Sequence, residues 1–351
     1  MNDAKEVENS SDGELKPEND GLAPPHKQNK HDAGDLAQMQ SLPLEVKIQM
    51  TKRRIREWYD AWDGDVYVSF SGGKDSTVLK HIVDSIYKDV PAVFVNTGLE
   101  YPEIHRFVKD VKAGKWSCFN PDVEIIRPEM RFDEVIKKYG YPVISKEVSQ
   151  KIYEGRRATR NGNPNNYATR QFNGEYISKS GKKNNYPVQR YKFLYESDIP
   201  ISNMCCNIMK KRPSKKYEHQ TGRKPFIATL ASESYLRKSE WLKNGCNAFE
   251  NDRPVSKPLS FWTENDVLEY ITKYDVPYCS VYGEIVEDPA GDLKTTKCDR
   301  TGCMYCMYGV HLEKSPNRFQ RMKETHPKQY DFCMNKLGIK EVLDYINVPY
   351  E

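Results

Sequence analysis

A short glycine turn is the first segment whose residue types and spacing could do chemistry. It reads Ser71-Gly-Gly-Lys-Asp-Ser76 and stands between an apolar run and a stretch with helical spacing. Adjacent glycines let the backbone come close to an anion, and the N–H groups of a following helix then point at it. The turn predicts a phosphate site, but it is not a G-x-x-x-x-G-K-[ST] loop because Asp75 follows Lys74. The residues expected to form the site are Ser71, Gly72, Gly73, Lys74, Asp75 and Ser76.

Two separated pairs of cysteines are the second chemical feature. Cys205 and Cys206 are adjacent, and Cys303-Met-Tyr-Cys306 is a C-x-x-C. Adjacent cysteines rarely bond to each other because that disulfide is strained. Together the pairs supply four thiolates, the number that a [4Fe–4S] cluster takes. Zinc, with Cys298 replacing one ligand, is one alternative, and four unrelated buried cysteines is another. The cysteines without a motif, interpreted as structural, are Cys118, Cys246, Cys279 and Cys333.

Composition sets the broad class of protein. The chain has 351 residues, 38% hydrophobic and 30% charged, which is enough for two domains or one large domain with insertions. It has no run of 18 apolar residues and no apolar leader, so we expect neither a membrane span nor a secretory signal. Nine cysteines in such a chain indicate the reducing cytoplasm.

Charge is unevenly distributed along the chain. Residues 1–40 hold nine acids and four lysines, a net of −5, and have no apolar pattern, so we expect them to be disordered. Because the whole chain is +4, the remainder is +9, which suits phosphate-bearing partners. Order is expected to begin near Leu44, in an amphipathic helix whose apolar stripe includes Ile48, Ile55 and Trp58.

The elements that must position these residues follow a βαβαβ order. Short apolar runs at 66–70, 91–95 and 123–126 predict buried strands, and helical spacing follows the first two. Such alternation predicts a parallel sheet with helices on both faces and ligands outside the carboxyl ends of the strands, where the glycine turn lies. A further strand is expected at 226–230. A helix is expected over 262–274, with Thr263 as a candidate N-cap.

Residues 156–195 interrupt this rhythm. They are rich in Asn and Gly, and Glu175 is the only acid between Arg156 and Lys192. A structureless loop of this length is unusual unless it is functional or mobile. Aromatic residues among basic ones suit single-stranded nucleic acid, whereas the simpler interpretation is a mobile surface insertion with a small hairpin. The basic residues are Arg156, Arg157, Arg160, Arg170, Lys179, Lys182, Lys183, Arg190 and Lys192, and the aromatic ones are Tyr167, Phe172, Tyr176, Tyr186 and Tyr191.

The glycine turn resembles the PP-loop of the adenine nucleotide α-hydrolase superfamily, which includes N-type ATP pyrophosphatases and the phosphoadenosine phosphosulfate (PAPS) reductase family. The resemblance implies a doubly wound, Rossmann-like α/β core whose loop holds pyrophosphate while a nucleophile attacks the α-phosphate. Residues 93–103 are similar to the family's second-strand motif, which ends in N-T-G and acidic residues. The residues implied beside the nucleotide are Asn96, Thr97 and Gly98, and those implied to hold Mg²⁺ are drawn from Asp75, Glu100 and Glu103.

The cysteine pattern resembles the cluster-binding form of the PAPS reductase family. C-C-x-x-x-K-K-x-P followed by G-C-x-x-C is similar to adenylyl-sulfate reductases and related sulfurtransferases. The resemblance implies a [4Fe–4S] cluster in a cysteine-rich, helical C-terminal region. Lys210 and Lys211 are implied to place positive charge near the cluster or the substrate. The implied ligands are Cys205, Cys206, Cys303 and Cys306.

Other segments also resemble this family. An E-S-x-x-R element implies that Glu233, Ser234 and Arg237 touch the nucleotide, with Arg237 catalytic alongside Lys74 and Asp75. His311 and Arg318 are weaker candidates. The resemblance covers residues 60–345 and leaves the tail and residues 156–195 outside it. The expected organisation is a 1–40 tail, a 41–155 nucleotide-binding core, a 156–195 insertion, and a 196–351 continuation with the cysteines.

Two departures from the reductases shape the functional prediction. Reductases usually end in E-C-G-x-H, whose cysteine attacks the sulfate sulfur, whereas the last cysteine here, Cys333, stands in D-F-C-M-N. The glycine turn also keeps the S-G-G-K-D-S form of ATP users. The resemblance therefore favours an ATP pyrophosphatase and sulfurtransferase with a cluster, similar to proteins of DNA phosphorothioation and some tRNA thiolases. The alternatives are a reductase of adenylyl sulfate or PAPS, and a nucleotide-binding module without turnover. The implied partners are an adenine nucleotide, a nucleic-acid acceptor, and a cysteine desulfurase or thiol reductant.

Overall fold

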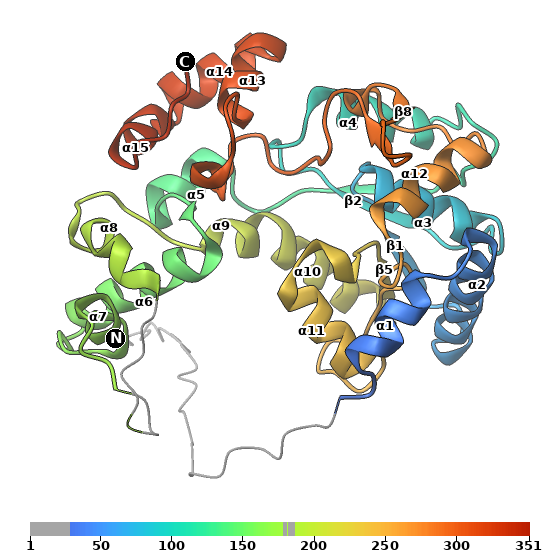
Figure 1. Ribbon diagram of the computed structural model, residues 1–351, viewed down its shortest axis with the longest axis horizontal. Coiled ribbons are helices and arrows are strands. Elements are labelled where there is room, and N and C mark those ends of the chain that lie inside the picture. Colours follow the sequence, from blue (N-terminus) through green and yellow to red (C-terminus); the bar gives the residue numbers. More distant parts are fainter. Residues whose placement is uncertain (1–28, 178–180, 182–186) are drawn as a thin grey trace, which may run out of the picture.

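A six-stranded sheet organises the nucleotide half of the molecule. The computed structural model describes residues 29–177, 181 and 187–351, and its strands lie in the order β3-β2-β1-β5-β7-β6 (Figure 1). All neighbours are parallel except β6 and β7, and Val68 lies opposite Ala92 on one side and Phe226 on the other. The predicted parallel α/β sheet is confirmed. The strands are β1 Val66–Ser69, β2 Ala92–Val95, β3 Val123–Ile126, β5 Lys224–Ile227, β6 Asn247–Ala248 and β7 Val255–Ser256.

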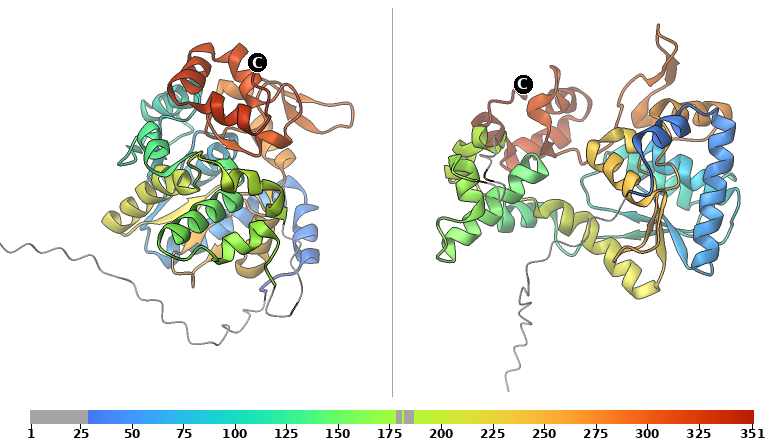
Figure 2. Two further views of the ribbon diagram at one scale, coloured as in Figure 1. Left: turned by 90° about the vertical axis from the view of Figure 1, so that its left-hand side faces the viewer. Right: turned by 60° about the horizontal axis from the view of Figure 1, so that its bottom comes forward.

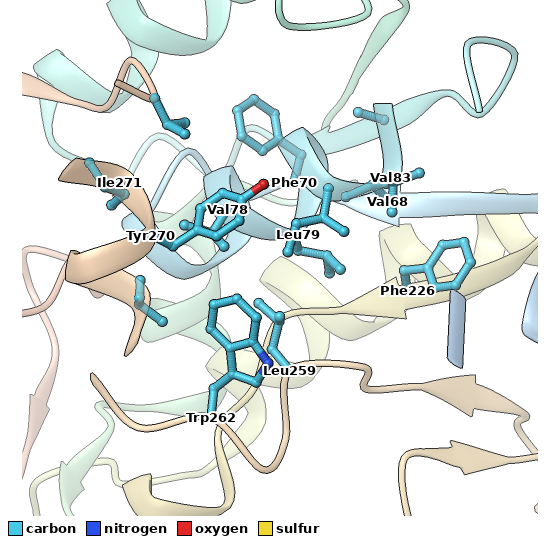
Figure 3. Packing of buried hydrophobic residues seen from close by; sticks show 14 of the residues in the cluster. Val68, Phe70, Val78, Leu79, Val83, Phe226, Leu259, Trp262, Tyr270 and Ile271 are labelled. Carbon is cyan, nitrogen blue, oxygen red and sulfur yellow. The ribbon is translucent and has the colours of Figure 1, made fainter. Parts of the chain in front are cut away.

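Helices cover both faces of this sheet. On one face, Val68 and Phe70 pack with α3 and α12, as the core residues in Figure 3 show. On the other face, Tyr67 and Val93 pack with Tyr217 of α10. Alternating side chains of one strand thus bury both faces, as a doubly wound sheet requires. The helices are α2 Leu44–Ala61, α3 Lys74–Asp84, α4 Pro102–Lys112, α10 Arg212–Thr221, α11 Tyr235–Asn244 and α12 Glu264–Lys273.

The predicted helix boundaries near residue 263 are confirmed by a cap. The Thr263 hydroxyl accepts from the N–H of Asp266, and the Asp266 carboxylate accepts from the N–H of Thr263 at 2.6 Å. The same carboxylate also receives Lys47 of α2 at 2.7 Å, in a pair that is almost fully buried. One acidic side chain therefore caps α12 and fastens it to α2.

A second hydrophobic cluster makes up a largely helical region beside the sheet (Figures 1 and 2). It draws on residues 130–209 and 304–348, which are distant in sequence. Residues 132–152, expected within the nucleotide-binding core, pack here because β4 (Val143–Ile144) pairs with β10 (Met307–Tyr308) and not with the central sheet. Its helices are α5 Phe132–Tyr139, α6 Lys146–Arg160, α7 Tyr167–Asn173, α8 Lys192–Glu196, α9 Met204–Cys206, α13 Arg318–Thr325, α14 Pro327–Asp331 and α15 Ile339–Tyr345.

The prediction that residues 1–40 are disordered is wrong for residues 33–40. Helix α1 (Ala33–Gln40) begins with a reciprocal cap between Asp32 and Asp35. Leu36 is buried, and the ring of His31 stacks on Trp241 at 4.6 Å. One buried leucine and one stacked ring fix this helix, a pattern too sparse to register as amphipathic. Residues 1–28 lie outside the described part of the chain.

The expectation of an unstructured loop over 156–195 is also wrong where the structure describes it. The segment holds the end of α6, then α7 and α8, and buries Phe172 and Leu194. Phe172 stacks on Tyr195 at 4.6 Å, and the Arg156 guanidinium donates to backbone carbonyls within α8 and in the turn after it. These side chains serve packing because the segment closes the helical cluster. Lys179, Lys182, Lys183 and Tyr186 fall outside the described residues.

None of the helices in the described ranges combines the length and the apolar character needed to cross a bilayer.

Candidate functional site

The glycine turn lies at the carboxyl end of β1, where α3 begins. Gly72 has φ +72°, and a β-carbon there would lie 2.9 Å from a methyl group of Ile104 and 3.0 Å from one of Val108. Both the left-handed backbone and the close approach of α4 therefore require glycine. The turn therefore packs against α4 and leads directly into the N-terminus of α3, as the position between strand and helix predicted.

Hydroxyl groups hold the turn in shape. The hydroxyls of Ser71 and Ser76 lie 2.9 Å apart, and the Ser76 hydroxyl donates to the carbonyl of Gly73 at 2.9 Å. The Thr77 hydroxyl donates to the same carbonyl at 3.0 Å. These contacts hold the backbone of the turn in one conformation, in which the N–H groups of Ser71 and Gly73 donate to the Ser76 and Ser71 hydroxyls at 3.2 and 3.3 Å.

Lys74 is buried and held by groups from the C-terminal half of the sheet domain. Its ammonium lies 2.9 Å from Glu264 and donates to the carbonyl of Asp299 at 3.0 Å. Its backbone N–H donates to the Tyr282 hydroxyl at 3.1 Å, and that hydroxyl lies 2.8 Å from the Thr301 hydroxyl. Residues 282–301 therefore occupy the donors that the sequence assigns to phosphate.

Asp75 carries an unsatisfied acceptor next to this lysine. Its Oδ1 is buried without a hydrogen-bond partner among the described residues, and its Oδ2 lies 3.9 Å from the Lys74 ammonium. Burial raises the pKa of Asp75, the Lys74 charge opposes this, and the Glu264 carboxylate adds to it. An unpartnered carboxylate oxygen at a phosphate turn is an available ligand for a hard cation.

The E-S-x-x-R element lies close to Asp75. Glu233 accepts from the N–H of Leu230 at 3.0 Å and pairs with Arg237 and, at 3.7 Å, with Arg300. Burial lowers the pKa of Arg237, the positive charge of Arg300 adds to this, and Asp75 opposes it. Ser234 caps α11 by accepting from the N–H of Arg237. Ser234 thus fixes the backbone at Arg237, and Glu233 holds its side chain near Asp75.

The N-T-G turn follows β2, the strand next to β1. The Thr97 hydroxyl donates to Glu100 at 2.6 Å, and Asn96 Oδ1 accepts from the N–H of Gly98 at 3.1 Å. Glu103 faces away, because it pairs with Arg106 at 3.3 Å and with His326 at 3.2 Å. Of the three carboxylates considered for Mg²⁺, the structure leaves Asp75 the most available.

The four motif cysteines come from both ends of the helical region. Cys205 and Cys206 form α9, which runs into a π-helical turn over Asn207–Lys211, while Cys303 and Cys306 bracket a turn before β10. Burial raises the pKa of the Cys205 thiol, and the charges of the other three cysteines raise it further. Burial also raises the pKa of Cys303 to about 11, with Lys210 opposing. The four sulfurs therefore act on one another across distant segments.

The four motif cysteines are not arranged as a complete metal site. Within the described ranges, no three His, Cys, Asp or Glu side chains are placed to hold a metal ion. All nine cysteines are free thiols. The donor set is nonetheless all sulfur, with no oxygen competitor, which is the chemistry that suits iron–sulfur or zinc and excludes magnesium and calcium.

The remaining candidate residues lie at different places in the structure. Desolvation of its ammonium lowers the pKa of Lys210, but the charges of Cys303 and Glu100 outweigh this and raise it. By surface area, Lys210 and Lys211 are both exposed residues. Arg318 donates to the carbonyl of Cys306 at 2.9 Å and so fixes the C-x-x-C turn. His311 lies 3.3 Å from the Tyr191 hydroxyl in the helical region. Among the cysteines without a motif, Cys246, Cys279 and Cys333 are buried and Cys118 is partly buried.

Sequence reasoning missed the residues that pack over the glycine turn. Tyr282, Asp299 and Thr301 contact it, and Glu264 holds Lys74, yet none stands in a motif that resembles a nucleotide site. Only long-range packing places them there. A signal for Glu264 exists in hindsight, because it follows the N-cap Thr263 and so must lie at the start of α12.

A family model and curated relatives match most of the chain. The model, described as the phosphoadenosine phosphosulfate reductase domain, matches residues 65–162 and 166–308. It runs through the segment that sequence reasoning left outside the resemblance. An uncharacterised Methanocaldococcus jannaschii protein is 25% identical over 79% of this chain, and the match spans about half of that protein's length. An adenosine 5′-phosphosulfate reductase of Bacillus mycoides is 22% identical over 73% of this chain and 87% of its own.

Two solved structures align with the chain at low similarity. A PAPS reductase from Candida auris is 14% identical, with a TM-score of 0.38 over 76% of this chain and 99% of its own. A U34-tRNA thiolase from Methanococcus maripaludis with its [4Fe–4S] cluster is 14% identical, with a TM-score of 0.33 over 87% of this chain and 82% of its own. At these values the fold assignment rests on the strand order and register described above.

Proposed function

The chain belongs to the phosphoadenosine phosphosulfate reductase domain family, and from that premise we propose that it is an ATP pyrophosphatase that activates an acceptor for sulfur transfer. The observation that carries the proposal is the buried Lys74 next to the half-buried Asp75 in the glycine turn, with the Asp75 Oδ1 buried and unpartnered. A lysine for phosphate charge and a free carboxylate oxygen for Mg²⁺ are what cleavage between the α- and β-phosphates needs.

The reaction assigns a role to each side of the site. The N–H groups of the turn and Lys74 hold the pyrophosphate, Asp75 holds Mg²⁺, and Arg237 stabilises charge on the α-phosphate. An acceptor oxygen attacks the α-phosphorus, the bond to the bridging oxygen breaks, and pyrophosphate leaves with the electron pair. A hydrosulfide-level donor then replaces the adenylate, AMP leaves with the acceptor oxygen, and one proton is released. The proposed source of that sulfur is the persulfide of a cysteine desulfurase, which two electrons from a thiol reductant cleave to hydrosulfide.

The four motif cysteines are the proposed ligands of a [4Fe–4S] cluster. Cys205, Cys206, Cys303 and Cys306 supply four thiolates, one for each iron, so such a cluster would be fully ligated and would supply redox and electrostatic chemistry beside the transferred atom. Lys210 supplies nearby positive charge that stabilises thiolates. Anaerobic protein should then contain about four irons per chain. Replacing Cys205 or Cys303 with Ser should remove most of them, while the buried Cys333→Ser should not.

A second candidate is a sulfonucleotide reductase. It is favoured by the curated relatives, several of which carry the names of adenylyl-sulfate or PAPS reductases. Against it stands Cys333, which is fully buried in a π-helical turn and is therefore not available to attack a sulfate sulfur.

Product analysis separates these functions. We expect anaerobic protein to release pyrophosphate and AMP from ATP and no sulfite from adenylyl sulfate or PAPS with a thiol reductant. Sulfite release would instead establish the reductase. Tight nucleotide binding without either product would indicate a module without turnover.

A further inference from the structure

A cavity of about 400 Å³ lies apart from the glycine turn, between the sheet and the helical region. It is lined by the N-T-G turn after β2, by the segment from Arg127 to Asp133 after β3, and by three side chains of the C-terminal part, Tyr305, Phe332 and Leu337. Neither the Ser71–Ser76 turn nor the Glu233–Arg237 element contributes to its lining. Its volume is in the range of small-ligand sites.

Aromatic rings form one wall of this cavity. The ring centroids of Phe132 and Tyr305 are 6.4 Å apart, and those of Tyr305 and Phe332 are 6.2 Å apart. Phe132 and Tyr305 are buried, whereas Phe332 is 41% exposed. An aromatic side chain that stays exposed beside a cavity can stack on a flat ring from solution.

The rim of the cavity carries two arginines and one carboxylate, that of Asp133. Arg127 and Arg131 are both exposed there, and Arg131 is held by Asp133 through contacts of 3.0 and 3.1 Å. Guanidinium groups match phosphate oxygens in geometry and charge. The amide oxygen of Asn96 is engaged by Gly98, which leaves its NH₂ group to donate to a polar ring edge. Flat rings, a hydrogen-bond donor and two guanidinium groups together match a nucleotide.

We propose that this cavity is the acceptor subsite and that it holds one base of a single-stranded nucleic acid, with the flanking phosphate on Arg127 or Arg131. The inference rests on the proposed sulfur-transfer function and names its substrate class. Tyr305 stands between Cys303 and Cys306, and the N–H of Met304 donates to the carbonyl of Leu99 in the cavity wall at 2.8 Å. A base in the cavity therefore lies beside the C-x-x-C turn. It also lies at the end of β2, which is the neighbour of β1, the strand that leads into the glycine turn.

The adenosine of ATP is the competing occupant, because Asn96 and Thr97 belong to the motif expected beside the nucleotide. The cavity lies toward β3, on the side of β2 away from β1, and no residue of the glycine turn lines it. We therefore assign the cavity to the acceptor and leave ATP to the β1 side of the sheet.

The test measures two affinities in the full-length protein. Fluorescence anisotropy with labelled mixed-sequence single-stranded DNA and RNA 12-mers reports the acceptor, and calorimetry with ATP reports the nucleotide. Phe332→Ala and Arg127→Gln should each weaken oligonucleotide binding about tenfold or more and leave ATP affinity unchanged. Phe249→Ala, which removes a ring of 40% exposure from the sheet domain, and Arg53→Gln on α2 are the matched controls and should change neither affinity.

The outcomes separate this inference from the proposed function. Loss of ATP affinity in Phe332→Ala, with oligonucleotide binding intact, would assign the cavity to adenosine and overturn the inference. Failure of the unaltered protein to bind either oligonucleotide at low salt would overturn it as well. Pyrophosphate release from ATP, measured separately without oligonucleotide, decides the proposed function in both cases.

Discussion

Replacing Lys74 with alanine separates a nucleotide-binding lysine from a merely structural one. In the free protein its ammonium is held by Glu264 at 2.9 Å and by the carbonyl of Asp299 at 3.0 Å. The Glu264 side chain is 43% exposed, so water can replace the lysine there, but Lys74 itself is buried and the Asp299 carbonyl loses its donor. The loss of stability should therefore be about 1–2 kcal/mol.

The consequence for ATP should be larger. A charge-assisted hydrogen bond to phosphate contributes about 1.5–3 kcal/mol, which corresponds to a loss of affinity of about 10- to 150-fold. Calorimetric titration with ATP in Mg²⁺ measures the affinity, and thermal unfolding measures the stability. The matched control is Lys151→Ala, which breaks a 2.8 Å Lys–Glu contact with Glu147 on α6, far from the turn in sequence and in the helical region.

The reasoning would be refuted by an unchanged affinity for ATP and for sulfonucleotides in Lys74→Ala. It would also be refuted if Lys151→Ala weakened ATP binding equally, because the effect would then follow from stability alone.

Three other substitutions test the positions of individual residues. Gly72→Ala should destabilise the protein by about 2 kcal/mol or more, since it adds a clash with α4 to a left-handed backbone, while Gly162→Ala, at φ +86° with open space around it, should show only the backbone cost of about 1 kcal/mol in thermal unfolding. Asp75→Asn should raise the melting temperature at neutral pH: burial raises the pKa of Asp75 above its ordinary 3.8, so ionising it costs stability once the pH exceeds that value, and the gain should shrink as the pH falls toward 4. No gain at neutral pH, or a gain that grows as the pH falls toward 4, would contradict this. Arg156→Ala should lower the free energy of unfolding by about 2–4 kcal/mol in chemical denaturation, because several carbonyls lose their donor. Replacement of the exposed Arg157 with alanine should be nearly neutral. A selective loss of nucleic-acid binding in Arg156→Ala would indicate a surface role instead.

Local patterns predicted the sheet and its motif residues well. The apolar runs at 66–70 and 91–95 mark β1 and β2, because a strand buried on both faces leaves a continuous apolar signature. The run at 123–126 is β3, an edge strand in which only Val123 is buried, and the strand expected at 226–230 is shifted, because β5 runs from Lys224 to Ile227. The glycine turn follows from the same logic, since Gly72 meets a steric demand that only glycine satisfies. These features depend on residues that are close in sequence, so the sequence alone can predict them.

Long-range placement was not readable from the sequence. Phe132 to Ile152 continue the strand-and-helix rhythm, yet β4 pairs with β10 far downstream and draws them into the helical region. Arg156 resembles a solvated basic residue and is instead bonded to the backbone. Tyr282 reaches the glycine turn across about 200 residues without a motif. In each case tertiary packing decided the role of a residue whose local surroundings carry no signal.

Isotope labelling of the nucleotide products tests the central claim most directly. Anaerobic protein incubated with ATP and Mg²⁺ in water enriched in oxygen-18 hydrolyses ATP slowly when no acceptor is present, and mass spectrometry locates the label. Attack at the α-phosphorus predicts oxygen-18 in AMP, unlabelled pyrophosphate, and loss of both products in Lys74→Ala. Label in inorganic phosphate with ADP as product, or no AMP at all, would contradict the account.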